Sequence, residues 1–481
     1  MVYRVVSTIM IRPGSVRLWA AASISIFVMA LTCQVLIPPV IGLADNGDFF
    51  RITAPLGLEP LAPPESRFFD HIVTEYVITG NPIGRQVFYS GELFAHCAVK
   101  LSQLRMPAGR FDIRWLGFTY AVVLCGLFSL FIHFLSRWGN VSRGIASVVV
   151  IWIFTDAMYS AYLNSFYTDV AGWLSFLTVV LALVFLLTGR SVAGGLVMFT
   201  TAGLVLATSK PQNAVVVIPI SGFLTYIVLT GSCGRMQRVV GCIVAICVAT
   251  VGLVYAVTVT RIYGQPALIS VVMARIAKQS PQPLNDVRFF GLDGDDLKYA
   301  GMHAFMPNGP GSNPGFVSRF SKTTAATLAL YYVEHPALAA GFIMEDLRVS
   351  GPRNRTLFGN FEKRDGVLPR AQSAEFVGWS RLRAMLFQIW PSHVFVLYAA
   401  ALAAPIAVCV RSRRTAARRP FALLIALLGL VGLIQLCLAS LFDATETERH
   451  LFMFHANTDV LIVAALIGAL EGWPTDKLGT K

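Results

Sequence analysis

Long apolar segments alternate with polar connections along most of the chain. Ten segments approach the length of about 20 predominantly apolar residues that an α-helix needs to cross a bilayer, although two of them, 144–161 and 192–208, are short or interrupted. The pattern predicts an all-α polytopic membrane protein with about ten transmembrane helices. The predicted spans are 18–40, 115–135, 144–161, 170–188, 192–208, 214–230, 239–260, 392–410, 421–441 and 450–470.

The first apolar segment follows a basic stretch, as the hydrophobic region of a signal peptide would. Arg4, Arg12 and Arg17 precede it, and it runs from about residue 18 to residue 40. That length crosses a membrane and exceeds the roughly 7–15 apolar residues of a signal peptide. Because no small-residue cleavage site follows it, we expect a retained first helix.

Two connections are much longer than the others, at about 41–114 and 261–391, and the span count places both on one side. Each contains an amphipathic stretch, 87–104 in the first and 267–278 in the second, for which we expect a helix lying along the membrane interface. The predicted organisation is a membrane module of about seven helices (1–260), the loop region 261–391, and a membrane module of about three helices (392–481).

Basic residues accumulate in alternate connections. Only 14% of the residues are charged, against about a quarter in a soluble protein, so the formal net charge of +13 is concentrated in the connections. Because an excess of Lys and Arg marks the cytoplasmic side, both termini are predicted to be cytoplasmic and both long connections extracytoplasmic. Orientation thus accounts for the charge without a nucleic-acid partner. The opposite short connections hold only Lys210 and Arg449, whereas the cytoplasmic set is Arg4, Arg12, Arg17, Arg137, Arg143, Arg190, Arg235, Arg238, Arg411, Arg413, Arg414, Arg418, Arg419, Lys477 and Lys481.

Metal-ligand patterns are weak in this sequence. The 8 cysteines are scattered, mostly inside apolar segments, and none forms a CxxC pair. Neither a zinc site nor a disulfide framework is therefore indicated. The turn 291–296 carries three aspartates that a calcium ion can use, but it lacks the Glu that closes an EF-hand loop, so a bare acidic turn is the favoured interpretation.

Ionisable and amide side chains gather in the short extracytoplasmic connections. They follow the first, third, fifth and ninth spans, and the last span adds His455, Asn457 and Asp459 within its outer half. The inner connections are bland apart from arginine. The four outer connections contain Asp45, Asn46, Asp48 and Arg51; Asp156, Asn164 and Asp169; Lys210, Gln212 and Asn213; and Asp443, Glu446, Arg449 and His450.

Each of these residues also has a structural explanation. Loops at a membrane edge are polar, and Asp45 or Asn46 can cap a helix that begins there. His455 and Asp459 are four residues apart, so they share a helical face and can pair to tie two helices together. Capping does not easily account for two acids followed by Arg51, however. The accumulation of acids, bases and amides in one compartment favours a functional site.

The chemistry of this set suits a lipid-linked phosphosugar. An outward-facing aspartate, Asp45 or Asp48, can act as general base toward a hydroxyl or hold a divalent cation through its oxygens. Lys210 and Arg449 are the natural partners of a phosphate. With the lipid tail in the bilayer, the base would activate an acceptor hydroxyl for attack on the anomeric carbon. Polyprenyl phosphate would leave against the cations, and one displacement inverts that carbon.

The ordered motifs resemble the GT-C membrane glycosyltransferases. In that superfamily the first outer loop carries an acidic residue or pair, often followed by an arginine and an aromatic, and residues 47–51 (Gly-Asp-Phe-Phe-Arg) fit this outline. Together with 164–169 (Asn-Ser-Phe-Tyr-Thr-Asp), 209–213 (Ser-Lys-Pro-Gln-Asn) and a late acidic segment that ends in Arg-His, 446–450 (Glu-Thr-Glu-Arg-His), the set is similar to bacterial hexosyltransferases of surface-glycan and S-layer glycan assembly. The resemblance covers most of the chain in motif order.

The resemblance implies a GT-C-like fold in the bacterial cytoplasmic (inner) membrane, with an extracytoplasmic active site. It implies a polyprenyl-phosphate sugar donor, an extracytoplasmic glycan or glycolipid acceptor, and the lipid bilayer as partners. It favours Asp48 as base, with Asp45 as cap, substrate contact or metal ligand. Many family members need no metal, whereas the oligosaccharyl transferases do, so a divalent cation at Asp45 and Asp48 stays open. The expected substrate- and phosphate-binding residues are Arg51, Asp169, Lys210, Gln212, Asn213, Glu446, Arg449, His450 and His455.

Three other functions share these features. One is an envelope-assembly scaffold without catalysis, against which the accumulation of Asp, Lys, Arg and His on one side argues. A transporter or flippase of a lipid-linked or anionic solute would have a similar helix count, but it would place ionisable residues near the bilayer midplane and broken helices in matching halves. A glycan polymerase or ligase would use the same lipid substrates. The one-sided polarity favours an enzyme over the transporter, and the sequence separates transfer from polymerisation poorly.

Overall fold

A computed structural model describes residues 13–63, 67–84, 87–107, 109–136, 138–189, 191–231, 233–351, 358–411 and 419–471. Part of the charge pattern that predicts the orientation lies outside these residues, namely Arg4, Arg12, Arg137, Arg190, Arg413, Arg414, Arg418, Lys477 and Lys481.

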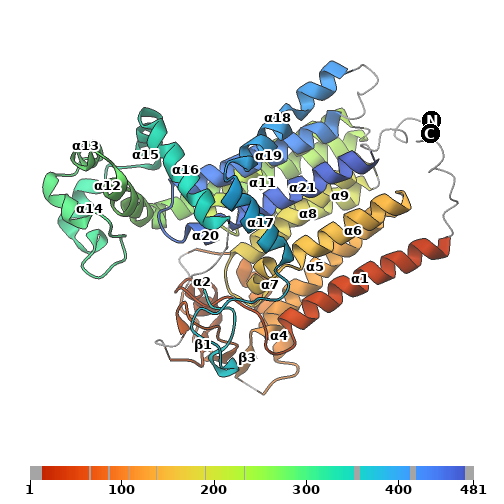
Figure 1. Ribbon diagram of the computed structural model, residues 1–481, viewed down its shortest axis with the longest axis horizontal. Coiled ribbons are helices and arrows are strands. Elements are labelled where there is room, and N and C mark those ends of the chain that lie inside the picture. The colour runs from red at the N-terminus through yellow and green to blue at the C-terminus, as the bar shows by residue number, and fades with distance from the viewer. Residues whose placement is uncertain are drawn as a thin grey trace.

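A bundle of long apolar helices forms the body of the molecule (Figure 1). All ten predicted segments are helical, and the all-α membrane fold is confirmed. The first helix ends five residues earlier than expected, because Pro38 and Pro39 follow it and proline cannot continue a helix. The bundle consists of α1 (Pro13–Val35), α5 (Arg114–Leu135), α6 (Asn140–Phe154), α7 (Ala157–Leu163), α8 (Asp169–Leu187), α9 (Val192–Ala207), α10 (Pro211–Thr230), α11 (Arg235–Ser270), α18 (His393–Arg411), α19 (Arg419–Leu441) and α21 (Phe452–Glu471).

The number of spanning helices is lower than the predicted ten. Among the described residues, seven helices are long and apolar enough to cross a membrane, and the number rises to nine if each of two bent pairs is one span. One pair is α6 with α7, bent by 58° where Asp156 interrupts the helix and accepts the amide of Met158 at 3.0 Å. The other is α17 (Gly378–Ile389) with α18, bent by 99°. The segment at 192–208 is the shorter apolar helix α9.

Helix α11 is much longer than the span predicted within it. Its 36 residues extend about 54 Å at 1.5 Å per residue, nearly twice the thickness of a bilayer's hydrocarbon core, about 30 Å. The helix continues without a break into the π-helical turn η4 (Val271–Ile276) and α12 (Ala277–Gln279). A continuous helix therefore joins the bundle to the second long connection, where the sequence predicted an end at residue 260.

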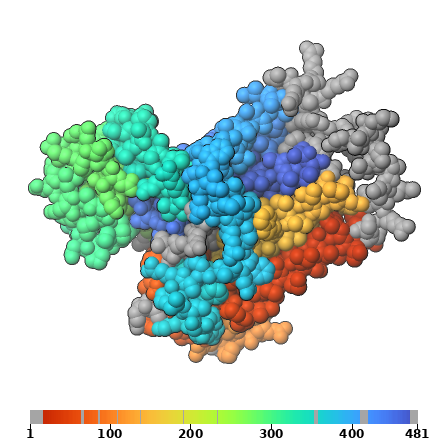
Figure 2. All heavy atoms as spheres, in the orientation of Figure 1, coloured from red at the N-terminus to blue at the C-terminus, as the bar shows by residue number. Residues whose placement is uncertain are grey.

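The part of the second long connection up to α16 forms a lobe beside the bundle, drawn in green in Figures 1 and 2. A hydrophobic core of its own includes Val272, Phe316, Tyr331 and Phe342. Beyond this lobe the connection continues through η7 to α17, which packs on the bundle. The connection contains α13 (Pro283–Phe289), η5 (Gly294–Tyr299), η6 (Pro310–Ser312), α14 (Pro314–Phe320), α15 (Ala325–Glu334), α16 (Pro336–Ser350) and η7 (Lys363–Asp365).

Two charged contacts stabilise the lobe. The buried Arg275 donates to the carbonyl of Ser440 on α19 at 2.6 Å and pairs with Asp346 Oδ1 at 2.6 Å. Burial raises the pKa of Asp346 to about 6 even though Arg275 acts to lower it. In the acidic turn 291–296, Asp296 accepts the amide of Asp293 and pairs with Arg319 at 2.5 Å. The carboxylate of Asp296 therefore stabilises the turn itself.

The first long connection contains a small sheet that the sequence analysis did not predict. Its strands β1 (Leu58–Pro60), β2 (Glu75–Ile78) and β3 (Arg110–Asp112) pair antiparallel in that order, with Glu59 opposite Val77 and Tyr76 opposite Phe111. The strands are only three or four residues long, too short for an alternation of apolar and polar residues to stand out. The connection also contains α2 (Phe50–Thr53), η3 (Ala54–Leu56) and α4 (Gly91–Ser102), and α4 falls within the amphipathic stretch predicted at 87–104.

Candidate active site

The turn between α1 and α2 is held by its own side chains. Asp45 Oδ1 accepts the amides of Gly47 at 2.7 Å and Phe49 at 3.2 Å, and Asn46 Oδ1 accepts the amide of Asp48 at 2.9 Å. Gly47 has a φ of +105°, which glycine adopts at little cost. Asp45 therefore fixes the turn ahead of α2 (Phe50–Thr53), whereas the N-cap residue of that helix is Phe49 and has no side-chain hydrogen bond, so the helix-capping role expected for Asp45 is not observed.

The segment 164–169 clamps this turn onto the bundle. Asn164 donates to the carbonyls of Val35 and Ile41, both at 2.9 Å, and the Tyr167 hydroxyl donates to the carbonyl of Ala44 at 2.8 Å. Phe49 packs edge-on against Tyr167 with ring centroids 4.8 Å apart. The second motif therefore positions the first.

Asp48 lies between two guanidinium groups. Its Oδ2 is 2.6 Å from Nη2 of Arg449, and its Oδ1 is 2.9 Å from Nη2 of Arg51. Arg449 also contacts Glu446 Oε2 through Nε at 3.0 Å, and its guanidinium lies 4.8 Å from the centroid of the Tyr167 ring. We call Asp48, Arg51, Glu446 and Arg449 the Asp48–Arg449 cluster. Arg449 is buried, with 6% of its side chain exposed, so breaking this pairing would cost about 3–5 kcal/mol.

Asp45 and Asp48 differ in their electrostatics. Burial acts to raise the pKa of both carboxyls, and for Asp45 it prevails over the two backbone hydrogen bonds and Arg67, so its pKa is raised. For Asp48 the charges of Arg449 and Arg51 outweigh burial, and its pKa is held well below the ordinary value of 3.8. Asp48 is thus fully ionised near neutral pH but is engaged by two cations.

Glu446 links the turn after α1 to the segment before α21. Its carboxylate accepts Asn46 Nδ2 at 2.7 and 2.5 Å. Its backbone has a φ of +52°, a left-handed conformation that costs a non-glycine residue of order 1–3 kcal/mol and is often found at functional sites. Asn46 and Tyr167 belong to the predicted outer connections, but neither was expected among the catalytic or substrate-binding residues. The 400-residue separation of Asn46 from Glu446 leaves no local pattern to reveal the contact.

Two further ion pairs lie beside the cluster. Lys210 Nζ is 2.9 Å from Asp169 Oδ1, and both side chains are buried. His450 Nδ1 is 2.6 Å from Asp443 Oδ2. Burial acts to raise the pKa of Asp443, but the charges of His450 and Lys210 hold it below the ordinary value. The four predicted outer connections therefore meet at one end of the bundle. They contribute Asp45, Asp169, Lys210 and Arg449, respectively.

Replacing Lys210 by methionine is expected to lower the free energy of unfolding by about 3–5 kcal/mol, because the buried Asp169 would lose its counter-ion. Thermal unfolding of the purified protein in detergent, followed by tryptophan fluorescence, measures this effect. The double variant Asp169→Asn, Lys210→Met should recover much of the lost stability. Lys100→Met, at an exposed position on α4, is the matched control. An unchanged midpoint in Lys210→Met would contradict the role of this pair.

Three of the predicted residues have other surroundings. Asn213 accepts Gln435 Nε2 at 2.9 Å and so links α10 to α19, whereas Gln212 is half-buried and its Oε1 has no hydrogen-bond partner among the described residues. The predicted pairing of His455 with Asp459 is wrong. His455 Nε2 lies 3.0 Å from Ser350 Oγ on α16. Asp459 instead accepts the Tyr159 hydroxyl at 2.5 Å and Trp379 Nε1 at 2.9 Å, because α7 and α17 pack on its side of α21.

The residues suit an anion better than a cation. Among the described residues no three His, Cys, Asp or Glu side chains gather as a metal site would require. Asp45 directs Oδ1 to backbone amides, and both oxygens of Asp48 face guanidinium groups. A divalent cation at the two aspartates would have to replace these contacts, whereas a phosphate would meet cations that are already in place.

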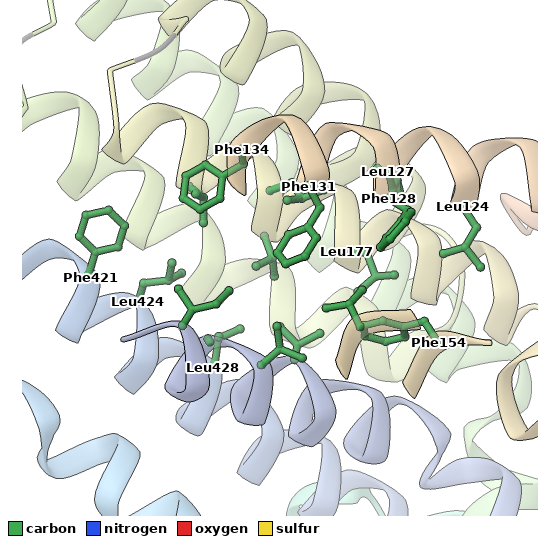
Figure 3. Close-up of a pocket in the computed structure, with 18 of the residues that line it drawn as sticks. Leu124, Leu127, Phe128, Phe131, Phe134, Phe154, Leu177, Phe421, Leu424 and Leu428 are labelled. Atoms are coloured by element: carbon green, nitrogen blue, oxygen red, sulfur yellow. The ribbon is translucent and has the colours of Figure 1, made fainter. Parts of the chain in front are cut away.

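An apolar cavity lies within the bundle (Figure 3). Its volume is about 130 Å³, and its wall is made of aliphatic and aromatic side chains. The helices that line it include α8, which begins at Asp169, and α21, which begins three residues after Arg449. The lining residues on these helices, such as Leu177 and Val463, lie about two turns or more beyond those ends. Its lining includes Phe27, Leu124, Phe128, Phe154, Leu177 and Val463.

The chain is similar to one known family over nearly its whole length. Residues 11–477 match the family model described as the YfdI N-terminal transmembrane domain. No curated protein and no solved structure gives a significant match to the chain.

Proposed function

The chain belongs to the YfdI N-terminal transmembrane domain family, a GT-C-like membrane family, and from this premise we propose that it is an inverting glycosyltransferase. It moves a hexose from a polyprenyl-phosphate donor to a glycan or glycolipid acceptor in cell-envelope assembly. On this proposal the protein is a multi-pass protein of the bacterial cytoplasmic membrane, with cytoplasmic termini and an extracytoplasmic active site. The orientation follows from the distribution of arginine and lysine among the loops.

The observation that carries the proposal is the position of Asp48 between Arg449 and Arg51. An aspartate next to phosphate-binding groups is what an inverting transfer needs. Asp48 takes the proton of the acceptor hydroxyl as the hydroxyl oxygen bonds to the anomeric carbon. The bond from that carbon to the phosphate oxygen breaks, and its electron pair leaves with polyprenyl phosphate. The donor phosphodiester has one negative charge and the leaving phosphate gains a second, so the arginines act most strongly in the transition state.

Donor binding would also release the base. Without donor, Arg51 pairs with Asp48, and Arg449 pairs with both Asp48 and Glu446 among the described residues. A phosphate that takes over Arg449 and Arg51 removes the charges that lower the pKa of Asp48. The carboxylate then becomes more basic at the moment when an acceptor hydroxyl can be activated. The wall of the apolar cavity matches an isoprenoid tail, which would reach it from the phosphate site along α8 and α21.

This exchange predicts different acidic limits for two kinetic parameters. The pH profile of kcat/KM reports the free enzyme and that of kcat the substrate complex. With a pKa below 3.8, free Asp48 stays ionised down to that pH, so kcat/KM should show no acidic limb from Asp48 above about pH 4. The acidic limb of kcat should lie at higher pH, because donor phosphate has displaced the arginines. A kcat/KM limb well above pH 4 that disappears with Asp45→Asn would instead identify Asp45 as the base.

A comparison of envelope glycans from cells with and without the gene tests the proposed function. Loss of one hexose from an otherwise complete glycan, seen by mass spectrometry and linkage analysis, is the expected result. Shortened chains would indicate polymerisation, and accumulation of a precursor on the cytoplasmic side would indicate flipping. Either of the last two outcomes would overturn the proposal.

A further inference from the structure

A second cavity lies on the other side of the Asp45–Asp48 turn. Its volume is about 240 Å³, a little below the 300–1,000 Å³ typical of sites for drug-sized ligands, so it suits a small ligand. The first long connection forms it, from α2, η3 and the strands β1 and β2. Asp45 and Gly47 are part of its wall, whereas Asp48 is not. The turn therefore separates this cavity, which we call the sheet cavity, from the Asp48–Arg449 cluster.

The wall of the sheet cavity combines aromatic rings with hydrogen-bonding groups of both kinds. Asp45 and Glu59 supply carboxylates, Arg67 a guanidinium and Asn81 an amide. The aromatic members are Phe49, Phe50, Phe68 and Tyr76. Acceptors, donors and ring faces thus surround one space.

Arg67 has unused hydrogen-bonding capacity here. Its guanidinium lies 4.6 Å from the centroid of the Phe68 ring, and its Nε is buried with no hydrogen-bond partner among the described residues. Arg67 and Asp45 both line the cavity, and within the described part of the chain Arg67 Nε makes no hydrogen bond to Asp45 or to any other group. A buried N–H without a partner is costly, so a ligand that accepts from Arg67 would relieve that cost.

The composition of this wall selects one ligand class. A phosphate would meet the carboxylates of Asp45 and Glu59, which repel it. A lipid tail would leave the charged groups desolvated. A saccharide has hydroxyls that both donate and accept, as well as C–H faces that pack on aromatic rings. It is the ligand that satisfies carboxylates, guanidinium, amide and rings together.

We infer that the sheet cavity binds the saccharide end of the acceptor, a subsite distinct from that of the donor phosphate. The inference rests on the proposed function. The acceptor hydroxyl would reach Asp48 across Gly47, where nothing lies within 4 Å of the position that a Cβ would occupy. Asp45, fixed by its two backbone hydrogen bonds, holds a neighbouring hydroxyl. The two aspartates then have separate tasks on opposite sides of one turn.

Saturation-transfer NMR on the purified full-length chain in lipid nanodiscs tests this inference, with methyl α-glucoside, α-mannoside and α-galactoside as probes. At least one glycoside should bind the wild type. Arg67→Gln and Asn81→Ala should each weaken that binding, with about a tenfold loss for Arg67→Gln as expected for a lost hydrogen bond to a charged group. Arg110→Gln is the matched control. Arg110 is a half-exposed arginine of the same sheet, it does not line the cavity, and it lies 3.8 Å from Glu75. Equal binding in wild type and both cavity variants, or binding of none of the probes, would overturn the inference.

Hydrolysis of a polyprenyl-phosphate hexose by the same samples distinguishes failure of the proposed function from failure of the proposed acceptor site. Transfer of hexose to water needs the donor site and Asp48 but no acceptor. Arg67→Gln should therefore hydrolyse the donor at the wild-type rate while its KM for the acceptor glycan rises. A wild type that neither hydrolyses nor transfers would count against the proposed function, even if glycoside binding followed the expected pattern. Normal hydrolysis with unchanged acceptor KM in Arg67→Gln would count against the sheet cavity alone.

Discussion

Asp48→Asn is expected to lower hexose transfer by roughly 10²–10⁴-fold, the range that a positioned general base contributes. Asparagine matches aspartate in size, but its amide does not accept the hydroxyl proton. The fold should survive, because Arg449 keeps Glu446 as a partner at 3.0 Å. Transfer of labelled hexose from a polyprenyl-phosphate donor in proteoliposomes measures the rate, and thermal unfolding of the same sample measures stability.

Two other aspartates serve as controls for this variant. Asp70→Asn changes a surface residue that pairs with Arg370, so transfer should be unaffected. Asp45→Asn keeps an oxygen that accepts the amides of Gly47 and Phe49, so the turn should persist and the loss of rate should be smaller than for Asp48→Asn. Wild-type transfer by a folded Asp48→Asn would remove Asp48 as the base, and a larger loss in Asp45→Asn would transfer that role to Asp45.

Arg449→Ala is expected to raise the KM for the donor and to lower kcat by roughly 10²–10³-fold, as for loss of one transition-state hydrogen-bond donor. The physical reason is that Arg449 is the buried cation shared by Asp48 and Glu446, where a departing phosphate would replace Asp48. The alanine variant also leaves those two carboxylates without their common partner, which would cost about 3–5 kcal/mol of stability. Steady-state kinetics over a range of donor concentrations separates KM from kcat.

Arg449→Lys distinguishes a lost site from a lost fold. Lysine restores the charge but not the planar fork that holds two anions at once, so its kcat should lie between those of wild type and alanine variant while stability recovers. Arg319→Ala is the matched arginine control, since Arg319 is 40% exposed in the lobe and pairs with Asp296. Unchanged donor KM and kcat in Arg449→Ala would exclude Arg449 from the phosphate site.

The apolar segments predicted the helices well, because a helix in lipid needs a continuous local run of apolar residues. They did not predict the small sheet, whose strands of three or four residues pair across long distances. They also did not predict the length of α11, since its C-terminal part packs against the lobe and carries mixed residues. Asp156 ended one helix and capped the next, a break that an apolar run does not reveal.

The sequence predicted several residues of the candidate site but not the contacts between them. Motif spacing selected Asp48, Lys210 and Arg449, but only the fold shows that Arg449 pairs with Asp48 and Lys210 with Asp169. The pairing of His455 with Asp459 failed for the same reason. Four-residue spacing places two side chains on one face of a helix, but the helices packed on that face supply the partners, here Ser350, Tyr159 and Trp379.

The central claim is that this protein moves a hexose from polyprenyl phosphate through the Asp48 site. The most direct measurement uses purified protein in liposomes that contain an undecaprenyl-phosphate [¹⁴C]hexose of known anomeric configuration and an envelope glycolipid extract. We expect labelled glycolipid with inverted configuration at the hexose in the wild type and none above background in Asp48→Asn. Labelled donor carried across the bilayer without formation of a new glycosidic bond, or product of retained configuration, would contradict the claim.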